Sequence, residues 1–398
     1  MRILLLTPSL PFPPHRGDKL KIFNLVRNLS RRHEVVLLTF TSSRKDERYI
    51  PDVRRLCSEV RTVRLPVWQS ILQCGLNVLS GRPFQVAYFS SRRMRRMLAG
   101  TLREGKFDIV HTHFIRMAQY TAALKGVPRL LDLTDAVSLY LERFLARERN
   151  PLKRLLLRSE YQRMRRYESI IGRYDMTMVC SVVDRDVLLA SAPGARVELL
   201  ENGVDLDYFC PDHGAPPEEG TIICTGNMSY FPNANGVRYF VEKIFPLVKS
   251  RVPGARFLAV GQNPPASVRR LGSPDVVVTG AVPDIRSYYL RSVVAVSPIR
   301  FGSGTLNKVL EPMALGVPVV ATPVGTEGLP MKNGEHLLIA ESAEDFADRV
   351  VELLVDPALR HRLAMNALSL VRARYGWPQI AGKLEQAYGE IAGRGAQP

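Results

Sequence analysis

Short apolar runs recur along the whole chain, and most are followed by a loop and an amphipathic segment. Continuous apolar runs of about four to eight residues are typical of strands that are buried on both faces of a sheet. The runs that predict strands are residues 2–7, 34–40, 60–65, 108–113, 126–132, 176–180, 197–200, 221–225, 255–260, 276–278, 293–296 and 317–321. Helical periodicity predicts helices over residues 18–29, 151–172, 285–290, 306–315, 343–355, 357–375 and 377–391, and another that starts near Gly236. This alternation predicts an α/β fold with parallel, doubly wound sheets.

The chain of 398 residues is too long for one ordinary hydrophobic core, so two domains are expected. Asn202 and Gly203 form a tight-turn dipeptide between the two series of strands, and we place the interdomain hinge there. The predicted domains are residues 1–200 and 201–375. Residues 376–398 are expected to form a C-terminal helix that packs back on the first domain, followed by a polar tail.

The net charge of +17 lies almost entirely in the first half of the chain. Residues 1–199 hold 36 lysines and arginines against 18 acidic residues, whereas residues 200–398 hold 19 against 20. Such a basic half suits nucleic acid, an anionic membrane surface or an anionic substrate. Nucleic acid is the weakest of the three because no recognised binding motif is present and aromatic residues do not interleave the basic runs.

The predicted helix over residues 151–172 has an apolar stripe surrounded by lysines and arginines. One interpretation is a core-packed helix with a solvated basic face. The other is a surface helix that lies on anionic lipid, joined by the basic cluster of residues 92–96.

Five cysteines without a CxxC pair indicate a reduced chain without a zinc site. No stretch approaches about eighteen uninterrupted apolar residues, so no membrane span is predicted. We therefore expect a cytoplasmic protein, with peripheral attachment to the inner face of the cell membrane suggested by the basic half.

Residues 298–328 carry the densest candidate chemistry, in the order strand, glycine loop, helix and strand. A helix N-terminus directs amide groups and partial positive charge at an anion. Arg300 and Lys308 add two cations, and Glu311 lies one helical turn after Lys308, where a carboxylate can accept hydrogen bonds from ribose hydroxyls. The loop between them contains Gly302, Ser303, Gly304 and Thr305. These features favour a nucleotide-diphosphate site over the alternative, a βαβ unit at the surface in which the Lys–Glu pair is incidental.

Other loops at strand ends carry weaker signals. Gly17 precedes a predicted helix and is a candidate for close approach of backbone to ligand, although an ordinary connection explains it equally well. His111 and His113 alternate along one strand and so share a face. They suit a metal pair, a general base or a sugar contact. Because no carboxylate or cysteine accompanies them at ligand spacing, we predict no metal and no cofactor.

The combination of motifs resembles the group 1, family 4 glycosyltransferases over nearly the whole chain. The resemblance rests on residues 16–19, 108–111, 202–205, 226–228, 280–284 and 308–316. Within the family, the loops at residues 17–19 and 231–233 are most similar to bacterial sugar transferases of exopolysaccharide and PEP-CTERM systems. The resemblance implies two Rossmann-like domains that face a cleft, the GT-B architecture.

It also implies transfer with retention from a nucleotide-diphosphate sugar on the second domain, without a metal. The acceptor, lipid-linked or a glycan, is expected on the first domain, with an anionic membrane surface as a further partner and no nucleic acid. By position, Glu311 would hold the ribose, Arg300 and Lys308 the diphosphate, and His111 the sugar or the acceptor. The remaining donor-binding residues would be Gly17, Gly226, Asn227, Val282, Gly302, Ser303, Gly304, Thr305 and Thr326.

Two departures from the family pattern affect these assignments. Ser303 stands where a second carboxylate is often found, which puts the choice of sugar in doubt. Asn227 and Ser229 stand where an arginine and a lysine are usual, so Arg300 and Lys308 would supply the whole cationic clamp. Catalysis would then consist of stabilising the departing diphosphate. A sugar-nucleotide epimerase of the same architecture and a basic binding module for membrane or nucleic acid are the alternative functions.

Overall fold

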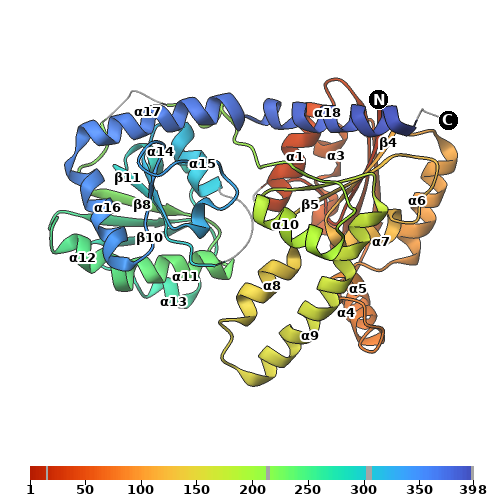
Figure 1. Ribbon diagram of the computed structural model, residues 1–398, viewed down its shortest axis with the longest axis horizontal. Coiled ribbons are helices and arrows are strands. Elements are labelled where there is room, and N and C mark those ends of the chain that lie inside the picture. Colours follow the sequence, from red (N-terminus) through yellow and green to blue (C-terminus); the bar gives the residue numbers. More distant parts are fainter. Residues whose placement is uncertain (15–16, 212–215, 302–306, 396–398) are drawn as a thin grey trace. The chain divides into compact units, whose positions relative to one another are not determined.

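The computed structural model describes residues 1–14, 17–211, 216–301 and 307–395. By its internal contacts the chain divides into two compact units (Figure 1). The N-terminal unit comprises residues 1–201 together with 378–398, and the C-terminal unit comprises residues 202–377. Each unit contains one sheet in which every strand pair is parallel. The predicted α/β class with parallel, doubly wound sheets is confirmed.

The sheet of the N-terminal unit has the strand order β3-β2-β1-β4-β5-β6-β7. Its strands are β1 (Arg2–Thr7), β2 (Glu34–Thr41), β3 (Glu59–Arg64), β4 (Ile109–His113), β5 (Arg129–Thr134), β6 (Met176–Val179) and β7 (Val197–Leu199). Its α-helices are α1 (Gly17–Leu29), α2 (Arg44–Glu47), α3 (Ile50–Arg54), α4 (Val67–Leu76), α5 (Phe84–Tyr88), α6 (Arg92–Glu104), α7 (Ala118–Thr121), α8 (Val137–Leu145), α9 (Pro151–Tyr167), α10 (Val182–Ser191) and α18 (Trp377–Gly395). Short 3₁₀ turns span Ile115–Met117 and Glu168–Arg173.

The sheet of the C-terminal unit has the strand order β10-β9-β8-β11-β12-β13. Its strands are β8 (Thr221–Thr225), β9 (Arg256–Val260), β10 (Val276–Gly280), β11 (Val294–Ser297), β12 (Val319–Ala321) and β13 (Leu338–Ile339). Its helices are α11 (Phe231–Tyr239), α12 (Phe245–Lys249), α13 (Ala266–Arg269), α14 (Arg286–Leu290), α15 (Asn307–Ala314), α16 (Ala343–Val355) and α17 (Pro357–Arg374). A π-helical turn, Phe240–Ile244, joins α11 to α12, and a 3₁₀ turn spans Val324–Thr326.

Several predicted helix boundaries were wrong. The helix expected to start near Gly236 begins at Phe231, and the proline that follows occupies the first turn, where its missing N–H costs nothing. The helix expected to run to residue 172 ends at Tyr167 and continues as a 3₁₀ turn. Between residues 67 and 104, where the sequence predicted no helix, the structure has α4, α5 and α6.

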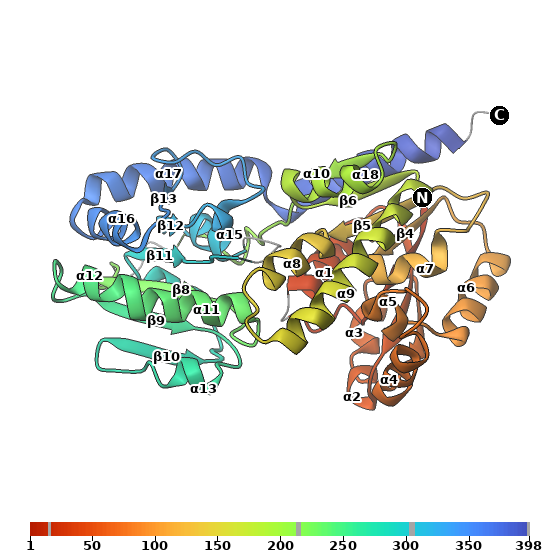
Figure 2. The same cartoon turned by 60° about the horizontal axis from the view of Figure 1, so that its bottom comes forward.

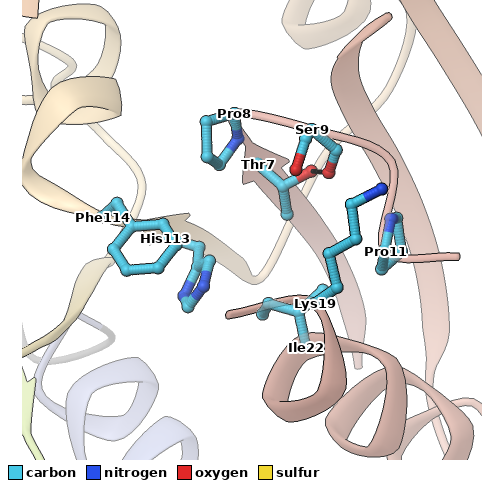
Figure 3. A pocket seen from close by; sticks show the side chains of 8 residues that line it. All are labelled: Thr7, Pro8, Ser9, Pro11, Lys19, Ile22, His113 and Phe114. Atoms are coloured by element: carbon cyan, nitrogen blue, oxygen red, sulfur yellow. Dashed lines mark hydrogen bonds between the residues drawn. The ribbon is translucent and has the colours of Figure 1, made fainter. Parts of the chain in front are cut away.

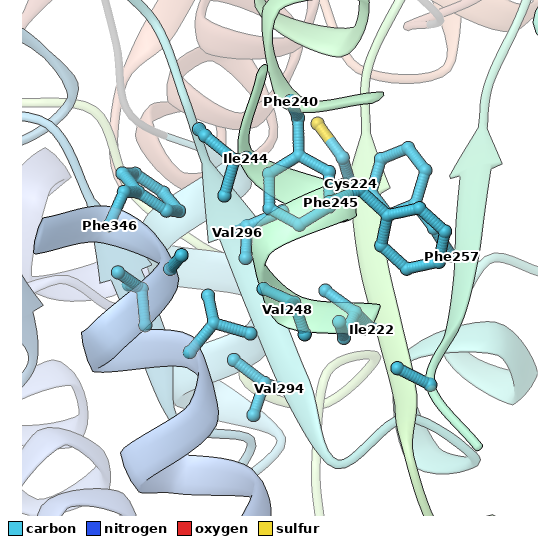
Figure 4. Packing of buried hydrophobic residues seen from close by; sticks show 14 of the residues in the cluster. Ile222, Cys224, Phe240, Ile244, Phe245, Val248, Phe257, Val294, Val296 and Phe346 are labelled. Atoms are coloured by element: carbon cyan, nitrogen blue, oxygen red, sulfur yellow. The ribbon is translucent and has the colours of Figure 1, made fainter. Parts of the chain in front are cut away.

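Both faces of each sheet are buried under helices (Figures 1 and 2). On one face of the N-terminal sheet, Leu4, Leu6 and Val110 pack against α6 and α7 in a cluster that includes Met94 and Met117. The C-terminal unit has an aromatic core, in which the rings of Phe240 and Phe257 lie 4.5 Å apart (Figure 4). The central strands are therefore mostly apolar, whereas the edge strand β3 alternates apolar with polar and charged residues.

Helix α18 belongs to the N-terminal unit although it follows the C-terminal unit in sequence. Its Glu385 accepts hydrogen bonds from Arg32 and pairs with His33 at 3.1 Å. Its Glu390 pairs with Arg196, and Tyr388 is fully buried against His111. These contacts fix α18 on the first sheet.

We expect the substitution Phe240→Ala to lower the free energy of unfolding by about 3–5 kcal/mol, because it removes a fully buried ring from the aromatic core. The substitution Val355→Ala, at a position that is 64% exposed, should change it by less than about 0.5 kcal/mol. Urea titration followed through the fluorescence of Trp377, which is buried in the same unit, measures both. Equal effects of the two substitutions would contradict this assignment of the core.

Candidate functional site

Each sheet reverses its strand order at one point, and ligands of open α/β sheets bind beyond the carboxyl ends of the strands at such a point. In the C-terminal unit the reversal lies between β8 and β11, because the chain continues from β8 to β9 and β10 on one side and from β11 to β12 and β13 on the other. The strands there end at Thr225 and Ser297. Gly226 and Arg300 lie in the loops that follow.

Glycines allow these loops to approach one another closely. Gly226 and Gly261 follow the neighbouring strands β8 and β9 and have φ angles of +146° and +150°. A Cβ atom on Gly261 would overlap the carbonyl oxygen of Gly226, and one on Gly226 would lie 2.8 Å from Asn233 Nδ2. Side chains would strain the backbone and fill this space, so only glycine fits at both positions.

Glu311, on α15, is half-buried beside this edge of the sheet. Its Oε2 accepts a hydrogen bond of 3.2 Å from the hydroxyl of Tyr289, which in turn lies 2.5 Å from Thr225 Oγ1. Burial raises the pKa of Glu311 from 4.5 to about 7, although the Tyr289 hydrogen bond and the charge of Lys308 oppose the shift. Among the described residues nothing donates a hydrogen bond to Oε1, so this oxygen is available to a ligand hydroxyl.

Lys308 is tied to the loop that follows β8. Its ammonium donates a hydrogen bond to Asn233 Oδ1, and Asn233 Nδ2 donates one of 2.9 Å to the carbonyl oxygen of Asn227. Burial lowers the pKa of Lys308, whereas Cys224 and Glu311 act in the opposite direction. A ligand anion here would meet a cation that is already held in place by its neighbours.

Arg300 lies on the solvent side of α11. Its guanidinium donates a hydrogen bond of 2.9 Å to Asn235 Oδ1 and stacks 4.3 Å from the ring centre of Tyr239. Lys308 and Arg300 therefore bind two different asparagines of the same helix, Asn233 and Asn235. Their convergence on one diphosphate stays a prediction.

The remaining predicted donor residues have varied surroundings. The amide of Thr326 donates to the carbonyl oxygen of Pro323 within a 3₁₀ turn, and Val282 packs half-buried against an apolar cluster. Gly17 is the first residue of α1. Gly302, Ser303, Gly304 and Thr305 lie outside the described residues.

The N-terminal unit reverses its strand order between β1 and β4, and a small pocket lies there (Figure 3). The residues that line it are Thr7, Pro8, Ser9, Pro11, Lys19, Ile22, His113 and Phe114. Of the two histidines, His113 lines the pocket. Both rings are 1% exposed, and His111 Nδ1 lies 2.5 Å from the Tyr388 hydroxyl of α18. Burial lowers the pKa of His111 to about 3, so its ring is neutral.

A buried charged network supports His113 from behind. His113 Nδ1 lies 3.1 Å from Asp132 Oδ2, and Asp132 Oδ1 accepts a hydrogen bond of 3.0 Å from Lys21 Nζ. Lys21 also donates to the carbonyl oxygen of Leu200, at 3.2 Å. Burial alone would raise the pKa of Asp132, but the Lys21 ammonium and the His113 hydrogen bond hold it well below its usual range. The network therefore contains an ionised Asp132 between a lysine and a histidine.

The structure supplies a carboxylate that sequence spacing had not associated with the histidines. Within the described ranges, His111, His113 and Asp132 form a group whose ligand atoms all lie within 4.8 Å of one another. Asp132 joins them because β4 and β5 are neighbours and pair His113 with Asp132 in register. The ammonium of Lys21 already supplies the positive charge that a metal ion would bring to this carboxylate.

Two family models match consecutive parts of the chain. Residues 22–208 match Glycosyltransferase Family 4, and residues 219–356 match Glycosyl transferases group 1. Together they span both units. The chain belongs to the group 1, family 4 glycosyltransferases.

Relatives of this glycosyltransferase come from several bacteria. An uncharacterized 44.6 kDa protein in the cps region of Klebsiella pneumoniae is 21% identical over 94% of this chain and 96% of its own length. The lipopolysaccharide core biosynthesis mannosyltransferase LpcC of Rhizobium leguminosarum bv. viciae is 27% identical over 62% of this chain and 73% of its own length.

Solved structures show the fold of the transferase. Sucrose-phosphate synthase from Thermosynechococcus elongatus superposes with a TM-score of 0.74 at 19% identity, covering 99% of this chain and all of that chain. HepE of Anabaena, in complex with UDP and glucose, gives a TM-score of 0.69 at 14% identity over 98% of this chain and all of that chain. Such neighbours are GT-B glycosyltransferases, and the GT-B fold is therefore confirmed for the transferase.

Sequence reasoning missed Tyr289, Asn233 and Lys21. Tyr289 and Asn233 hold Glu311 and Lys308 through hydrogen bonds between elements that are far apart in sequence. Lys21 had the periodicity of a surface position on α1, yet it is 1% exposed. The one available signal was Asp132, a carboxylate at the end of an apolar strand, since a buried charge requires a partner.

We expect Lys21→Met to lower the free energy of unfolding by about 3–5 kcal/mol, because it leaves the buried carboxylate of Asp132 without its cation. Lys106→Met, at an exposed position, is the matched control. A double variant that also carries Asp132→Leu should recover part of the loss. Urea unfolding measures all three, and a Lys21→Met protein as stable as the control would contradict the role of the ion pair.

The raised pKa of Glu311 predicts a pH dependence of stability. The folded protein binds this proton more tightly than the unfolded chain, so the stabilising contribution is complete below about pH 4.5 and is lost as the pH rises through about 7. The melting temperature of the wild type, minus that of Glu311→Gln, should therefore fall between about pH 5 and pH 8. Differential scanning calorimetry checks this, with the exposed Glu344→Gln as control. A difference that does not vary with pH would argue against protonation at Glu311.

Proposed function

We propose that this glycosyltransferase moves a sugar, with retention, from a nucleoside-diphosphate sugar to a lipid-linked or glycan acceptor in the synthesis of exopolysaccharide or another cell-surface glycan. The observation that carries the donor half is the pairing of Glu311 and Lys308 on α15 at the strand-order reversal of the C-terminal unit. Glu311 presents an oxygen that is open to ribose hydroxyls, and Lys308 is a fixed cation one helical turn away.

The chemical role of the C-terminal unit would be to stabilise the leaving diphosphate. Negative charge develops on the diphosphate as the glycosidic bond breaks, and preorganised donors stabilise this charge more in the transition state than in the ground state. Lys308 would supply the central cation, with Arg300 as the second cation after it leaves Asn235. Metal-independent transfer is part of this proposal.

On the acceptor side, the lining of the N-terminal pocket favours His113 over His111 for the sugar or acceptor contact. Asp132 and Lys21 would fix the orientation of the His113 ring. The relatives support the acceptor class, since they include a lipopolysaccharide core biosynthesis mannosyltransferase and a phosphatidylinositol monomannoside mannosyltransferase of Mycobacterium tuberculosis. The Klebsiella relative from a cps region supports the exopolysaccharide context. Cytoplasmic location with peripheral attachment to the membrane is consistent with this context and belongs to the same proposal.

The first test is donor binding. Nucleoside-diphosphate sugars with different bases and sugars should differ in how far they raise the melting temperature, because a ligand at about 100 times its Kd stabilises the folded state by about 2.7 kcal/mol. The preferred donor should lose its effect in Lys308→Ala and Glu311→Ala. If no nucleotide sugar raises the melting temperature, the donor assignment is wrong.

The second test is transfer. Lys308→Ala and Glu311→Ala should each lower the rate of sugar transfer by about a hundredfold or more without unfolding the protein. Lys332→Ala and Glu335→Ala are matched controls, because they break an exposed Lys–Glu pair of the same spacing. Radiolabelled donor with a membrane extract as acceptor gives the readout. Full activity in both site variants would refute the site, and conversion of the donor without acceptor would indicate an epimerase instead.

A further inference from the structure

Helix α4 presents its apolar side chains to the outside of the N-terminal unit. Ser70 is fully buried and Gln69, Gln73 and Cys74 are half-buried, so the polar side of the helix faces the protein. The five large apolar residues of the helix are between 52% and 69% exposed. They are Val67, Trp68, Ile71, Leu72 and Leu76. This orientation is the reverse of an ordinary amphipathic surface helix.

The reversed orientation is held by specific contacts. Cys74 Sγ lies 3.5 Å from the carbonyl oxygen of Phe84, which begins the neighbouring helix α5. Leu65, just before α4, is buried in the core that also contains Val63 of β3. The helix therefore enters from a fixed strand and is docked on α5 through its polar side.

The exposed apolar surface continues onto the loop after α4 and onto α9. Leu79 is 98% exposed, and Leu152, Leu155 and Leu156 are exposed in the first turns of α9. Two hydrogen bonds join α9 to the loop after α4 and to α5. Arg163 of α9 donates one of 2.6 Å to the carbonyl oxygen of Val78. Glu160 of α9 accepts one of 2.9 Å from the amide of Phe84. Figures 1 and 2 show the α8–α9 and α4–α5 hairpins projecting on the same side of this unit. We call α4, Val78, Leu79 and residues 152–156 the outer apolar surface.

Positive charge surrounds this surface. Lys153, Arg154 and Arg158 alternate with the exposed leucines of α9, and none of them forms an ion pair with any residue in the described ranges. Arg64 ends the strand that leads into α4, and it lines a groove together with Arg93 and Arg96 of α6. Among the described residues the only acidic side chain lining that groove is Glu104, which is already paired with Arg61.

We propose that the outer apolar surface docks the transferase on an anionic lipid bilayer, with α4 lying in the interface. Exposed apolar patches of this kind mark interaction sites, and apolar side chains combined with unpaired cations match acyl chains beneath anionic headgroups. Among the described residues no helix is long and apolar enough to cross a bilayer, so docking at the interface is the mode that the structure favours. The proposal deepens the membrane clause of the proposed function, and it is argued from the N-terminal unit alone.

The central experiment compares binding to vesicles of phosphatidylglycerol and phosphatidylcholine with binding to phosphatidylcholine alone. The double substitution Ile71→Asp and Leu72→Asp should weaken sedimentation with the anionic vesicles at least about tenfold, because two apolar side chains no longer enter the interface. Met365→Asp, an exposed apolar position on α17 of the other unit, is the matched control and should bind like the wild type. All three positions are exposed, so neither variant should have an appreciably lower melting temperature.

Trp68 provides a direct reporter. The chain has two tryptophans, and Trp377 is 3% exposed whereas Trp68 is 68% exposed. Vesicles should shift the emission to shorter wavelength in the wild type and leave it unchanged in Trp68→Phe.

The contribution of positive charge to lipid binding is tested by a variant in which Lys153, Arg154 and Arg158 are replaced by alanine. This variant should lose about tenfold or more of its preference for anionic over neutral vesicles, and also most of its sensitivity to salt.

The proposal is overturned if the Ile71→Asp and Leu72→Asp protein binds anionic vesicles like the wild type, or if Trp68 emission does not respond to lipid. It is also overturned if the wild type ignores vesicles and forms a dimer that the same substitutions dissociate, since a second copy would then cover the surface. The melting temperature measured with nucleotide sugars distinguishes a failure of the docking surface from a failure of the proposed function. Lipid binding without donor binding would sustain the docking surface and refute the proposed function, and the reverse result would do the opposite.

Discussion

Both sheets of this glycosyltransferase are covered by helices on both faces, and every strand pair is parallel. A strand in such a sheet has no solvated face, so a polar side chain within it must find a partner or lie at an end. Because all strands of a sheet run in one direction, their carboxyl ends share one edge. The chemistry of both units is therefore confined to the loops at that edge, and the point where the strand order reverses leaves space for a ligand.

Two buried carboxyl groups at these edges have pKa values shifted in opposite directions, because their partners differ. Glu311 accepts a hydrogen bond from a neutral phenol, and its pKa rises to about 7 because no cation fully compensates for its burial. Asp132 lies against the ammonium of Lys21, and its pKa is held far below the ordinary range. In the proposed function the first group would receive ligand hydroxyls, whereas the second is an ionised carboxylate that accepts from Lys21 and lies 3.1 Å from His113 Nδ1. The partner, rather than the degree of burial, decides the state of each carboxyl.

The outer apolar surface differs from the two cores, because its large apolar side chains face outward. Elsewhere in the transferase, large apolar side chains fill the space between sheet and helix, as Phe240 and Phe257 do. On α4 the polar side faces inward, and the apolar side has no cover within the described residues. The contacts of α4 with α5, and of the following loop with α9, hold this arrangement in place. It is consistent with a protein whose basic half works beside lipid.

The sequence by itself determined the fold class, all strands except the short β13, and most of the longer helices. Continuous apolar runs and helical stripes are local patterns, whereas short helices such as α2, α5 and α7 leave no such pattern. It also located the glycines that follow recognisable strands, and Lys308 and Glu311 on the helix after the glycine loop of β11. It could not distinguish His111 from His113, because both lie on one face of β4 and only the tertiary structure pairs the first with Tyr388 of α18 and the second with Asp132. Lys21, Tyr289 and Asn233 form hydrogen bonds with residues that are 22 to 111 positions away in the sequence. The orientation of α4 depends on its contact with α5. Those features were decided only by the tertiary structure, because a contact between distant segments leaves no periodic signal in either one.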